Sequence, residues 1–306
     1  MCGIVGLHLR DPNLYPRLGS LLETMLCQVV ERGPDSAGVA VYGDRRRCPD
    51  GYAAVSVLAA GAAPNQAPDQ APDQAPNEAL DALFPDAVVT TAGDTTIVAA
   101  PVRLDELLVA VRRALPLARV VGSGTDLTVY KGTGNPRDLA ATYDLAGAAG
   151  WQGLAHTRMA TESAVTPEGC HPFSVGPDQC LVHNGSFANH ASIRRDLEFD
   201  GVEFDSENDS EVGARFLAAR LAKGEDLEKA LRALCEAFDG FYTLLVTSSD
   251  GFAVVRDAIA CKPAIIAETG QWVAMASEFR ALAGLPGIEG ARIYEPEPER
   301  VYAWAR

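Results

Sequence analysis

The apolar positions of the first 60 residues fall into runs of different period. Residues 2–9 are almost uninterruptedly apolar and include adjacent β-branched residues, which predicts a buried strand. Between 18 and 29 the apolar residues recur every three or four positions, which predicts a helix with one face on a core. The Gly- and Pro-containing segment 32–38 interrupts both periods, and the short apolar run 39–42 predicts a second strand.

The second half of the chain consists mainly of short apolar runs. One longer stretch, 217–234, has helical spacing. Predicted strands lie at 153–155, 180–182, 241–246, 252–255 and 272–276. The Ser-Asp-Gly sequence at 249–251 is typical of a hairpin turn between two of them and indicates antiparallel pairing. The sequence therefore predicts an α+β fold, in which helices are segregated from an antiparallel sheet.

A repetitive segment separates the two halves. Residues 63–78 repeat an Ala-Pro-Asn/Asp-Gln/Glu tetrad, and a proline at every fourth position is incompatible with both helices and sheet ladders. We expect an extended Ala/Pro/Asp/Gln linker over 61–80. Residues 85–150 predict a small inserted α/β subdomain, and residues 1–50 and 150–306 the main domain around it. The elements expected in the insertion are strands at 95–99, 118–121 and 127–130 and a helix at 104–115.

Composition narrows the function classes. The chain has 306 residues and a formal charge of −15, from 41 acidic and 26 basic side chains. This charge repels phosphate backbones and anionic headgroups, so we expect neither nucleic acid nor a membrane as a partner. No apolar stretch approaches the roughly 18 residues that span a bilayer. The N-terminus lacks the pattern of a secretory signal, which predicts a cytoplasmic location.

Cys2 differs from the other six cysteines. The seven are odd in number, widely spread and without a C-x-x-C pair, so we expect neither a disulfide framework nor a metal site, and most of them as small core residues. Removal of Met1 would make Cys2 the first residue. Its α-amino group, with an unperturbed pKa of about 7.7 to 8.0, could then accept the thiol proton. The alternative is that Cys2 merely begins a buried strand.

Three later clusters offer ligand groups for an amino acid. Arg158 ends a short strand, its guanidinium suits a carboxylate, and Thr161 could add a hydroxyl. Asn184 and Gly185 offer donors for a developing oxyanion. The acidic segment 206–211, before an apolar helix, supplies a carboxylate that could bind an ammonium group. Taken alone, these features are also typical of a surface ion pair, a turn and a helix cap; together they describe an α-amino acid with a scissile carbonyl.

Five motifs occur in the order seen in class II glutamine amidotransferases. They are Met-Cys-Gly-Ile-Val-Gly (1–6), Arg-Gly-Pro-Asp-Ser-Ala-Gly (32–38), His-Thr-Arg-Met-Ala-Thr (156–161), His-Asn-Gly (183–185) and Asp-Ser-Glu (209–211). The chain therefore resembles this family. The resemblance implies the N-terminal-nucleophile hydrolase fold, a four-layer αββα sandwich. It also implies that the substrate is L-glutamine, which is hydrolysed to glutamate and ammonia without a metal or organic cofactor on this chain.

The same resemblance implies roles for eight residues. They are Cys2 as nucleophile with its own α-amino group as base, Asn184 and Gly185 as the oxyanion hole, Arg158 for the α-carboxylate, Asp209 for the α-ammonium, Thr161 in the glutamine pocket, and Arg32 and His183 as supporting residues. Two positions depart from the family pattern. Met159 replaces a residue that is often aromatic, and Glu162 one that is often histidine, which puts the shape of the pocket in question.

Within the family, the chain looks most like the glutaminase-like (A) subunit of N-methylglutamate synthase, a stand-alone glutamate-synthase-type amidotransferase subunit. The resemblance rests on segments 31–38 and 156–163 and on the insertion. Because no acceptor-using domain follows before Arg306, we expect the acceptor on another polypeptide. The implied partners are a glycine-rich β-helix subunit and a glutamate-synthase-like subunit that carries FMN and any iron–sulfur cluster. The implied reaction converts methylamine and L-glutamate to N-methylglutamate and ammonia.

Two other functions stay open. The chain could be an ordinary glutaminase subunit that supplies ammonia to a glutamate synthase. It could also be a catalytically silent scaffold subunit that keeps the fold and binds glutamate or its partners.

Overall fold

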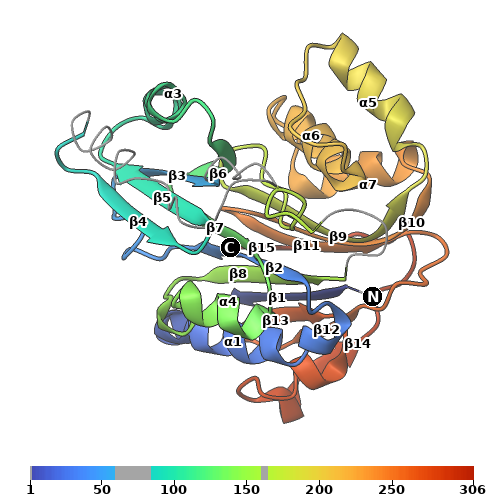
Figure 1. Cartoon of the computed structure of the whole chain (residues 1–306). Helices are drawn as coiled ribbons and strands as arrows, with labels where there is room; N and C mark the ends of the chain where they lie inside the picture. The colour runs from blue at the N-terminus through green and yellow to red at the C-terminus, as the bar shows by residue number, and fades with distance from the viewer. Residues whose placement is uncertain (1, 59–83, 160–164) are drawn as a thin grey trace.

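Two antiparallel sheets face each other in the computed structural model, which describes residues 2–58, 84–159 and 165–306 (Figure 1). The larger sheet has the order β14 (Arg292–Tyr294), β12 (Ile265–Glu268), β13 (Trp272–Ala276), β1 (Gly3–Leu9), β8 (Gln152–Arg158), β2 (Ser36–Tyr42) and β7 (Leu127–Thr133). The second sheet has the order β15 (Tyr302–Ala305), β11 (Gly251–Arg256), β10 (Gly240–Ser248) and β9 (Gln179–Phe187). The predicted hairpin at 249–251 joins β10 to β11.

Helices cover the outer faces of both sheets. On the larger sheet lie α1 (Leu18–Cys27) and α4 (Pro136–Thr142), and on the second sheet α6 (Asp209–Leu221) and α7 (Leu227–Ala237), with α5 (His190–Phe199) packed on α6 (Figure 1). Short 3₁₀ turns occur at η1 (Pro12–Arg17), η2 (Val30–Arg32), η3 (Leu145–Gly147), η4 (Phe279–Ala281) and η5 (Ile288–Gly290). The predicted α+β class and αββα layering are confirmed.

Strand β1 is buried on both faces, which explains its uninterrupted apolar run. Val5 and Leu7 pack in the apolar cluster that includes α1. Ile4 points the other way, into the cluster between the two sheets. Because alternate residues of a strand face opposite sides, a strand in the middle of a sandwich is mostly apolar or small on both faces; the exception is His8, which is buried and bonded to Gln152 at 2.8 Å.

The stretch 217–234, which has helical spacing, contains parts of two helices rather than one continuous helix. Helix α6 ends at Leu221 and α7 begins at Leu227. Gly224 between them has φ of +86°, a backbone conformation that favours glycine. Asp226 then caps α7 by accepting the backbone N–H of Lys229 at 2.7 Å. Apolar spacing alone hides this break because the two helices bury residues on the same cluster.

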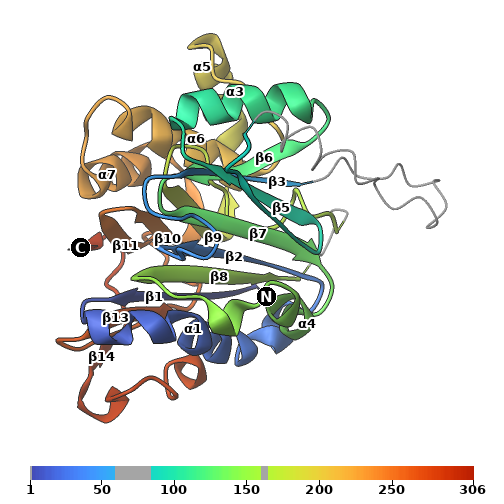
Figure 2. The ribbon, with the colours of Figure 1, turned by 90° about the vertical axis from the view of Figure 1, so that its left-hand side faces the viewer.

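A small third sheet lies beside the sandwich. Its order is β4 (Val88–Ala92), β5 (Thr95–Ala100), β3 (Ala53–Leu58) and β6 (Arg119–Gly124), and α3 (Leu104–Ala114) covers it (Figure 2). The range 85–150 is therefore divided between two sheets, because β7 pairs with β2 in the larger sheet and α4 packs on α1. Strand β3, which precedes the predicted linker, joins the small sheet. The linker range 61–80 lies outside the described residues.

The small sheet is tied to the sandwich by buried polar groups. Asp178 accepts the backbone N–H groups of Thr125, Asp126 and Leu127 at 2.9 to 3.1 Å, which fixes the turn between β6 and β7 to the segment that leads into β9. The hydroxyl of Ser56 in β3 accepts the N–H of Val129 in β7 at 3.0 Å. These bonds satisfy backbone donors that are shielded from water, and they hold the small sheet on the larger one.

The cysteines differ in how deeply they are buried. All seven cysteines are free: Cys48, Cys170 and Cys180 are buried, Cys27 and Cys235 are half-buried, and Cys261 is exposed. Only three of the six besides Cys2 are thus fully buried core residues.

Within 2–58, 84–159 and 165–306, no helix is long and apolar enough to cross a membrane.

Candidate active site

Cys2 lies directly before β1, at one end of the middle strands of the larger sheet. The two residues that follow it are fixed from both sides. The backbone N–H of Gly3 donates to Thr157 Oγ1 at 3.1 Å, and that of Ile4 donates to Ser277 Oγ at 2.9 Å. The position of the thiol is therefore set by β8 on one side and by the segment after β13 on the other.

The backbone carbonyl of Cys2 accepts two hydrogen bonds. Arg32 Nε and Asn184 Nδ2 each donate to it at 3.0 Å. Arg32 is itself held by Glu278 at 2.9 Å, and this hydrogen bond is the main reason that the pKa of Glu278 lies below its ordinary value. Arg32 thus contacts the main chain of the cysteine, in keeping with a supporting position.

The thiol of Cys2 is acidified by its surroundings. Burial by itself would raise its pKa, because a thiolate loses hydration. A hydrogen bond and the charge of His156, together with a backbone hydrogen bond from Met159, outweigh burial and lower the pKa of Cys2 to about 6. At neutral pH the group is therefore mostly a thiolate, which is the nucleophilic form.

Asn184 connects the cysteine to His156. Since Asn184 Nδ2 donates to the carbonyl of Cys2, Oδ1 is the acceptor that faces His156 Nε2 at 3.0 Å. An amide oxygen can only accept, so Nε2 carries the proton. Nδ1 of His156 has no other hydrogen-bond partner among the described residues, so it is the ring nitrogen that can bond the thiol of Cys2. The arrangement can take up the proton that leaves Cys2.

Gly185 follows Asn184 in β9 and cannot carry a side chain. Its φ is +140°, and a Cβ there would collide with the backbone oxygen of Phe241 on the neighbouring strand. Gly185 is exposed while Asn184 is buried, so the backbone at this point lies open beside the amide side chain. Donors from both residues can therefore face one substrate oxygen.

Asp209 begins α6 and is held at both carboxylate oxygens. Oδ2 accepts the backbone N–H of Phe187 at 2.9 Å, and Oδ1 accepts the hydroxyl of Ser210 at 3.3 Å. The side chain keeps 21% of its surface exposed. An ionised carboxylate offers about four lone-pair sites, so capacity remains for a ligand cation.

The hydroxyl of Ser210 also binds two buried histidines. His171 Nε2 lies at 3.0 Å and His183 Nδ1 at 2.9 Å from Ser210 Oγ. Because Ser210 donates its one proton to Asp209, both rings must donate to the oxygen. Burial is the main cause that lowers the pKa of His171 well below its ordinary value and that of His183 to about 4. Both rings are therefore neutral at pH 7, and this network orients Asp209.

The structure brings most of the predicted residues to one region. Cys2, Arg32 and Asn184 are in direct contact, and His183 reaches Asp209 through Ser210. Arg158 ends β8 on the same side as Cys2, because Gly3 is paired with Thr157; its guanidinium lies near Gly169. Thr161, predicted to line the pocket, lies outside the described residues, as does Glu162.

Sequence reasoning gave no role to His156, His171 or Ser210. His156 had an accessible indication, since it is two residues before Arg158 on the same strand and so faces the same side. His171 had none, because its partner Ser210 is 39 residues away. Across the described part of the chain, no group of three or more His, Cys, Asp or Glu side chains could hold a metal ion.

Comparison with known proteins decides the family. A family model described as "Glutamine amidotransferase domain" matches residues 156–284. Over 304 residues the chain is 46% identical to the "Glutamine amidotransferase-like protein GlxB" of Rhizobium meliloti (strain 1021), a match that covers 99% of this chain and 98% of the relative. The chain belongs to the glutamine amidotransferase family.

Other relatives match a part of a longer protein. The amidophosphoribosyltransferase of Methanocaldococcus jannaschii is 32% identical over 165 residues, which cover 53% of this chain and 35% of that protein. The solved glutamine phosphoribosylpyrophosphate amidotransferase from B. subtilis has a TM-score of 0.55 at 18% identity, and the match covers 99% of this chain and 49% of that one. This likeness confirms the predicted N-terminal-nucleophile fold of class II amidotransferases.

The acidity of Cys2 is testable by alkylation at different pH values. Because iodoacetamide reacts with the thiolate, labelling of Cys2 should have its midpoint near the pKa of about 6. His156→Gln removes the ring that lowers this pKa, so the midpoint should rise by about 1–3 pH units. Peptide mapping by mass spectrometry separates Cys2 from the other cysteines. His8→Gln, at a buried histidine that binds Gln152, is the matched control; an unmoved midpoint in His156→Gln would contradict the assignment.

Proposed function

We propose that the chain hydrolyses the side-chain amide of L-glutamine, with Cys2 as the nucleophile. The observation that carries this proposal is the position of Asn184, whose amide contacts both the carbonyl of Cys2 and the ring of His156. These contacts support a site in which Asn184 lies beside both the cysteine and the ring that acidifies its thiol. Membership of the glutamine amidotransferase family supports glutamine as the amide.

The reaction proceeds in two stages. The sulfur of Cys2 attacks the amide carbon, and the negative charge that forms on oxygen is bound by the second Nδ2 hydrogen of Asn184 and the N–H of Gly185. The nitrogen leaves as ammonia after it receives the proton that Cys2 has given up. Water then attacks the thioester, and glutamate and the free thiol are released. The α-amino group of Cys2, exposed once Met1 is removed, carries the proton, and His156 keeps the thiol acidic.

The two ends of the glutamine backbone are bound by opposite charges. Arg158 binds the α-carboxylate through its planar guanidinium, and the motif resemblance assigns Thr161 to the glutamine pocket. Asp209 binds the α-ammonium, a role that fits a carboxylate held by Phe187 and Ser210 with part of its surface exposed. Arg32 and His183 support the site without touching the substrate. The neutral His183 leaves the charge of Asp209 uncompensated for the ligand.

In this proposal the chain works within a larger assembly, whose overall reaction converts methylamine and L-glutamate to N-methylglutamate and ammonia. The chain serves as the amidotransferase-type subunit of N-methylglutamate synthase, with a glycine-rich β-helix subunit and a glutamate-synthase-like subunit that carries FMN and any iron–sulfur cluster. The motif resemblance supports this choice. A glutaminase subunit for a glutamate synthase and a catalytically silent scaffold are the alternatives.

Mass spectrometry of the intact protein tests the nucleophile. After exposure to an electrophilic glutamine analogue, the chain should lack Met1 and carry one adduct, which peptide mapping places on Cys2. Cys2→Ala should carry none. Retention of Met1 without any adduct would leave the proposed base absent and would favour the scaffold alternative.

Asn184→Ala tests the oxyanion hole. Glutamine turnover should fall by about 10² to 10³, the usual effect of deleting one oxyanion donor. Ammonia and glutamate release report turnover, and Asn13→Ala, an exposed amide that bonds only Asp11 locally, is the matched control. Turnover near that of the unmodified chain would remove Asn184 from this role.

An assay of the purified complex separates the two synthases. Methylamine plus L-glutamate should give N-methylglutamate and ammonia, whereas glutamine plus 2-oxoglutarate should give little product. The reverse preference would favour a glutamate synthase. A complex that lacks flavin would contradict the proposed FMN-binding partner.

A further inference from the structure

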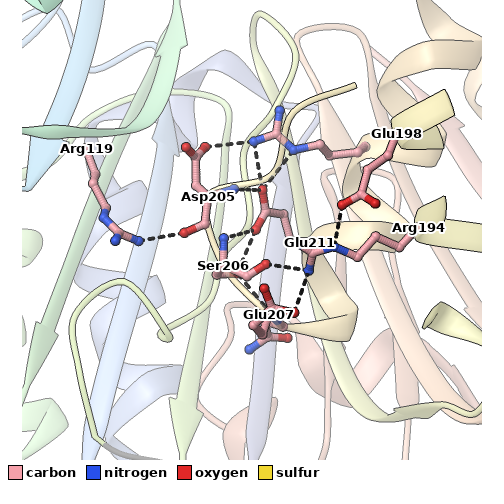
Figure 3. Close-up of polar contacts among 9 residues, drawn as sticks. Arg119, Arg194, Glu198, Asp205, Ser206, Glu207 and Glu211 are labelled. Atoms are coloured by element: carbon pink, nitrogen blue, oxygen red, sulfur yellow. Dashed lines mark hydrogen bonds and ion pairs between the residues drawn. The ribbon is translucent and has the colours of Figure 1, made fainter. Parts of the chain in front are cut away.

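Glu211 holds the loop that precedes Asp209. It lies in the first turn of α6, is 3% exposed, and accepts the backbone N–H groups of Asp205 at 2.8 Å and Ser206 at 2.7 Å and the hydroxyl of Ser206 at 2.6 Å (Figure 3). Burial favours the protonated acid, but these bonds and Arg215 keep the pKa of Glu211 below its ordinary value. The carboxylate is therefore charged at neutral pH and binds the loop strongly.

Two arginines complete a clamp around this loop, which we call the Glu211 clamp (Glu211, Arg215 and Arg194). Arg215 contacts Glu211 and the carboxylate of Asp205, both at 2.7 Å. Arg194 donates to the carbonyl of Ser206 at 2.8 Å. Both guanidinium groups also stack on the ring of Phe204. The loop is fixed on the helical side of the molecule by groups from α5 and α6.

One further contact reaches the loop from the small sheet. Arg119 in β6 donates through Nη1 to the carbonyl of Asp205 at 2.6 Å (Figure 3). Beside this bond a cavity of about 40 Å³ is lined by Arg119, Glu211 and Lys131, room for only a few water molecules. The hydrogen bond of Arg119 thus connects the small sheet directly to the clamped loop.

The loop determines where α6 begins. The hydroxyl of Ser206 accepts the N–H of Asn208 at 3.3 Å, and Asn208 Oδ1 caps the helix by accepting the N–H of Ser210 at 2.9 Å. Asp209 lies between these two residues. A shift of the carbonyl of Asp205 therefore moves the cap and, with it, the carboxylate of Asp209.

We propose that Arg119 is a positioning residue through which the small sheet sets the affinity of Asp209 for the α-ammonium group of the substrate. This inference rests on the proposed function of Asp209. The groups that hold Cys2, namely Thr157, Ser277, Arg32 and Asn184, belong to the sandwich. Movement of the small sheet, as when a partner subunit binds it, changes substrate affinity and leaves the reactivity of the thiol unchanged.

Inactivation kinetics with the electrophilic glutamine analogue test this inference. In Arg119→Ala the concentration for half-maximal inactivation should rise about three- to tenfold, as expected for the loss of one hydrogen bond. The maximal inactivation rate and the alkylation of Cys2 by iodoacetamide should be unchanged. Arg119→Lys keeps a donor and should recover part of the affinity. Arg112→Ala is the matched control and should have no effect, because Arg112 is an exposed arginine on α3, the helix that covers the same sheet.

Hydrogen exchange gives a second readout that does not depend on the proposed reaction. The amides of Asp205 and Ser206 should exchange faster in Arg119→Ala than in the unmodified chain or in Arg112→Ala. An unchanged half-maximal concentration in Arg119→Ala, with the unmodified chain labelled normally, would overturn the inference. If the analogue does not label the unmodified chain at all, the proposed function fails instead. In that case, unchanged exchange of the Asp205 and Ser206 amides in Arg119→Ala would also refute the effect of Arg119 on the loop.

Discussion

Strand β1 packs against helix α1 on one face and against the second sheet on the other, so its residues are apolar or small except for His8, which is buried and bonded to Gln152 at 2.8 Å. At Gly6 only the smallest residue fits, because a Cβ there would overlap Leu245 of the second sheet. With β13 and β8 paired on its two edges, β1 has no freedom to slide, since a shift by one residue would exchange its two faces. Cys2 is thereby fixed at one end of β1, where its carbonyl meets Asn184 of β9 and Arg32 of η2.

The pKa values of the ionisable groups at both ends of the site depend on a balance between burial and hydrogen bonding. Cys2 and Glu211 are each shielded from water, which favours their neutral forms, and each has a lowered pKa because its neighbours donate to or stabilise the charged form. His171 and His183 show the opposite outcome, since burial dominates and both stay neutral. The site therefore keeps negative charge on Cys2 and on Glu211, and keeps the two histidine rings uncharged.

The sequence predicted the individual strands and helices better than it predicted how they pair and pack. Strands such as β1 and helices such as α1 follow from local period, and the α+β class follows from them. The division of 85–150 between two sheets does not follow from local period. The sequence pattern of β7 resembles that of its neighbour β6, and only the pairing of β7 with β2 assigns β7 to the larger sheet. The same holds for the site. Cys2, Arg158 and Asn184 stand in motifs, whereas the contacts of His171 and Arg119 span 39 and 86 residues and leave no trace in the local sequence.

Strand β9 sets the distance between Cys2 and Asp209. Its Asn184 binds the carbonyl of Cys2, and the N–H of its Phe187 binds Asp209, three residues or about 10 Å farther along the strand. Gly185 lies between them in a conformation that favours glycine, with no room for a Cβ against β10. A side chain at this position would push β9 away from β10 and change the spacing of the two ends of the site together. Gly185 is therefore needed for the geometry of the whole site, whatever its own N–H binds.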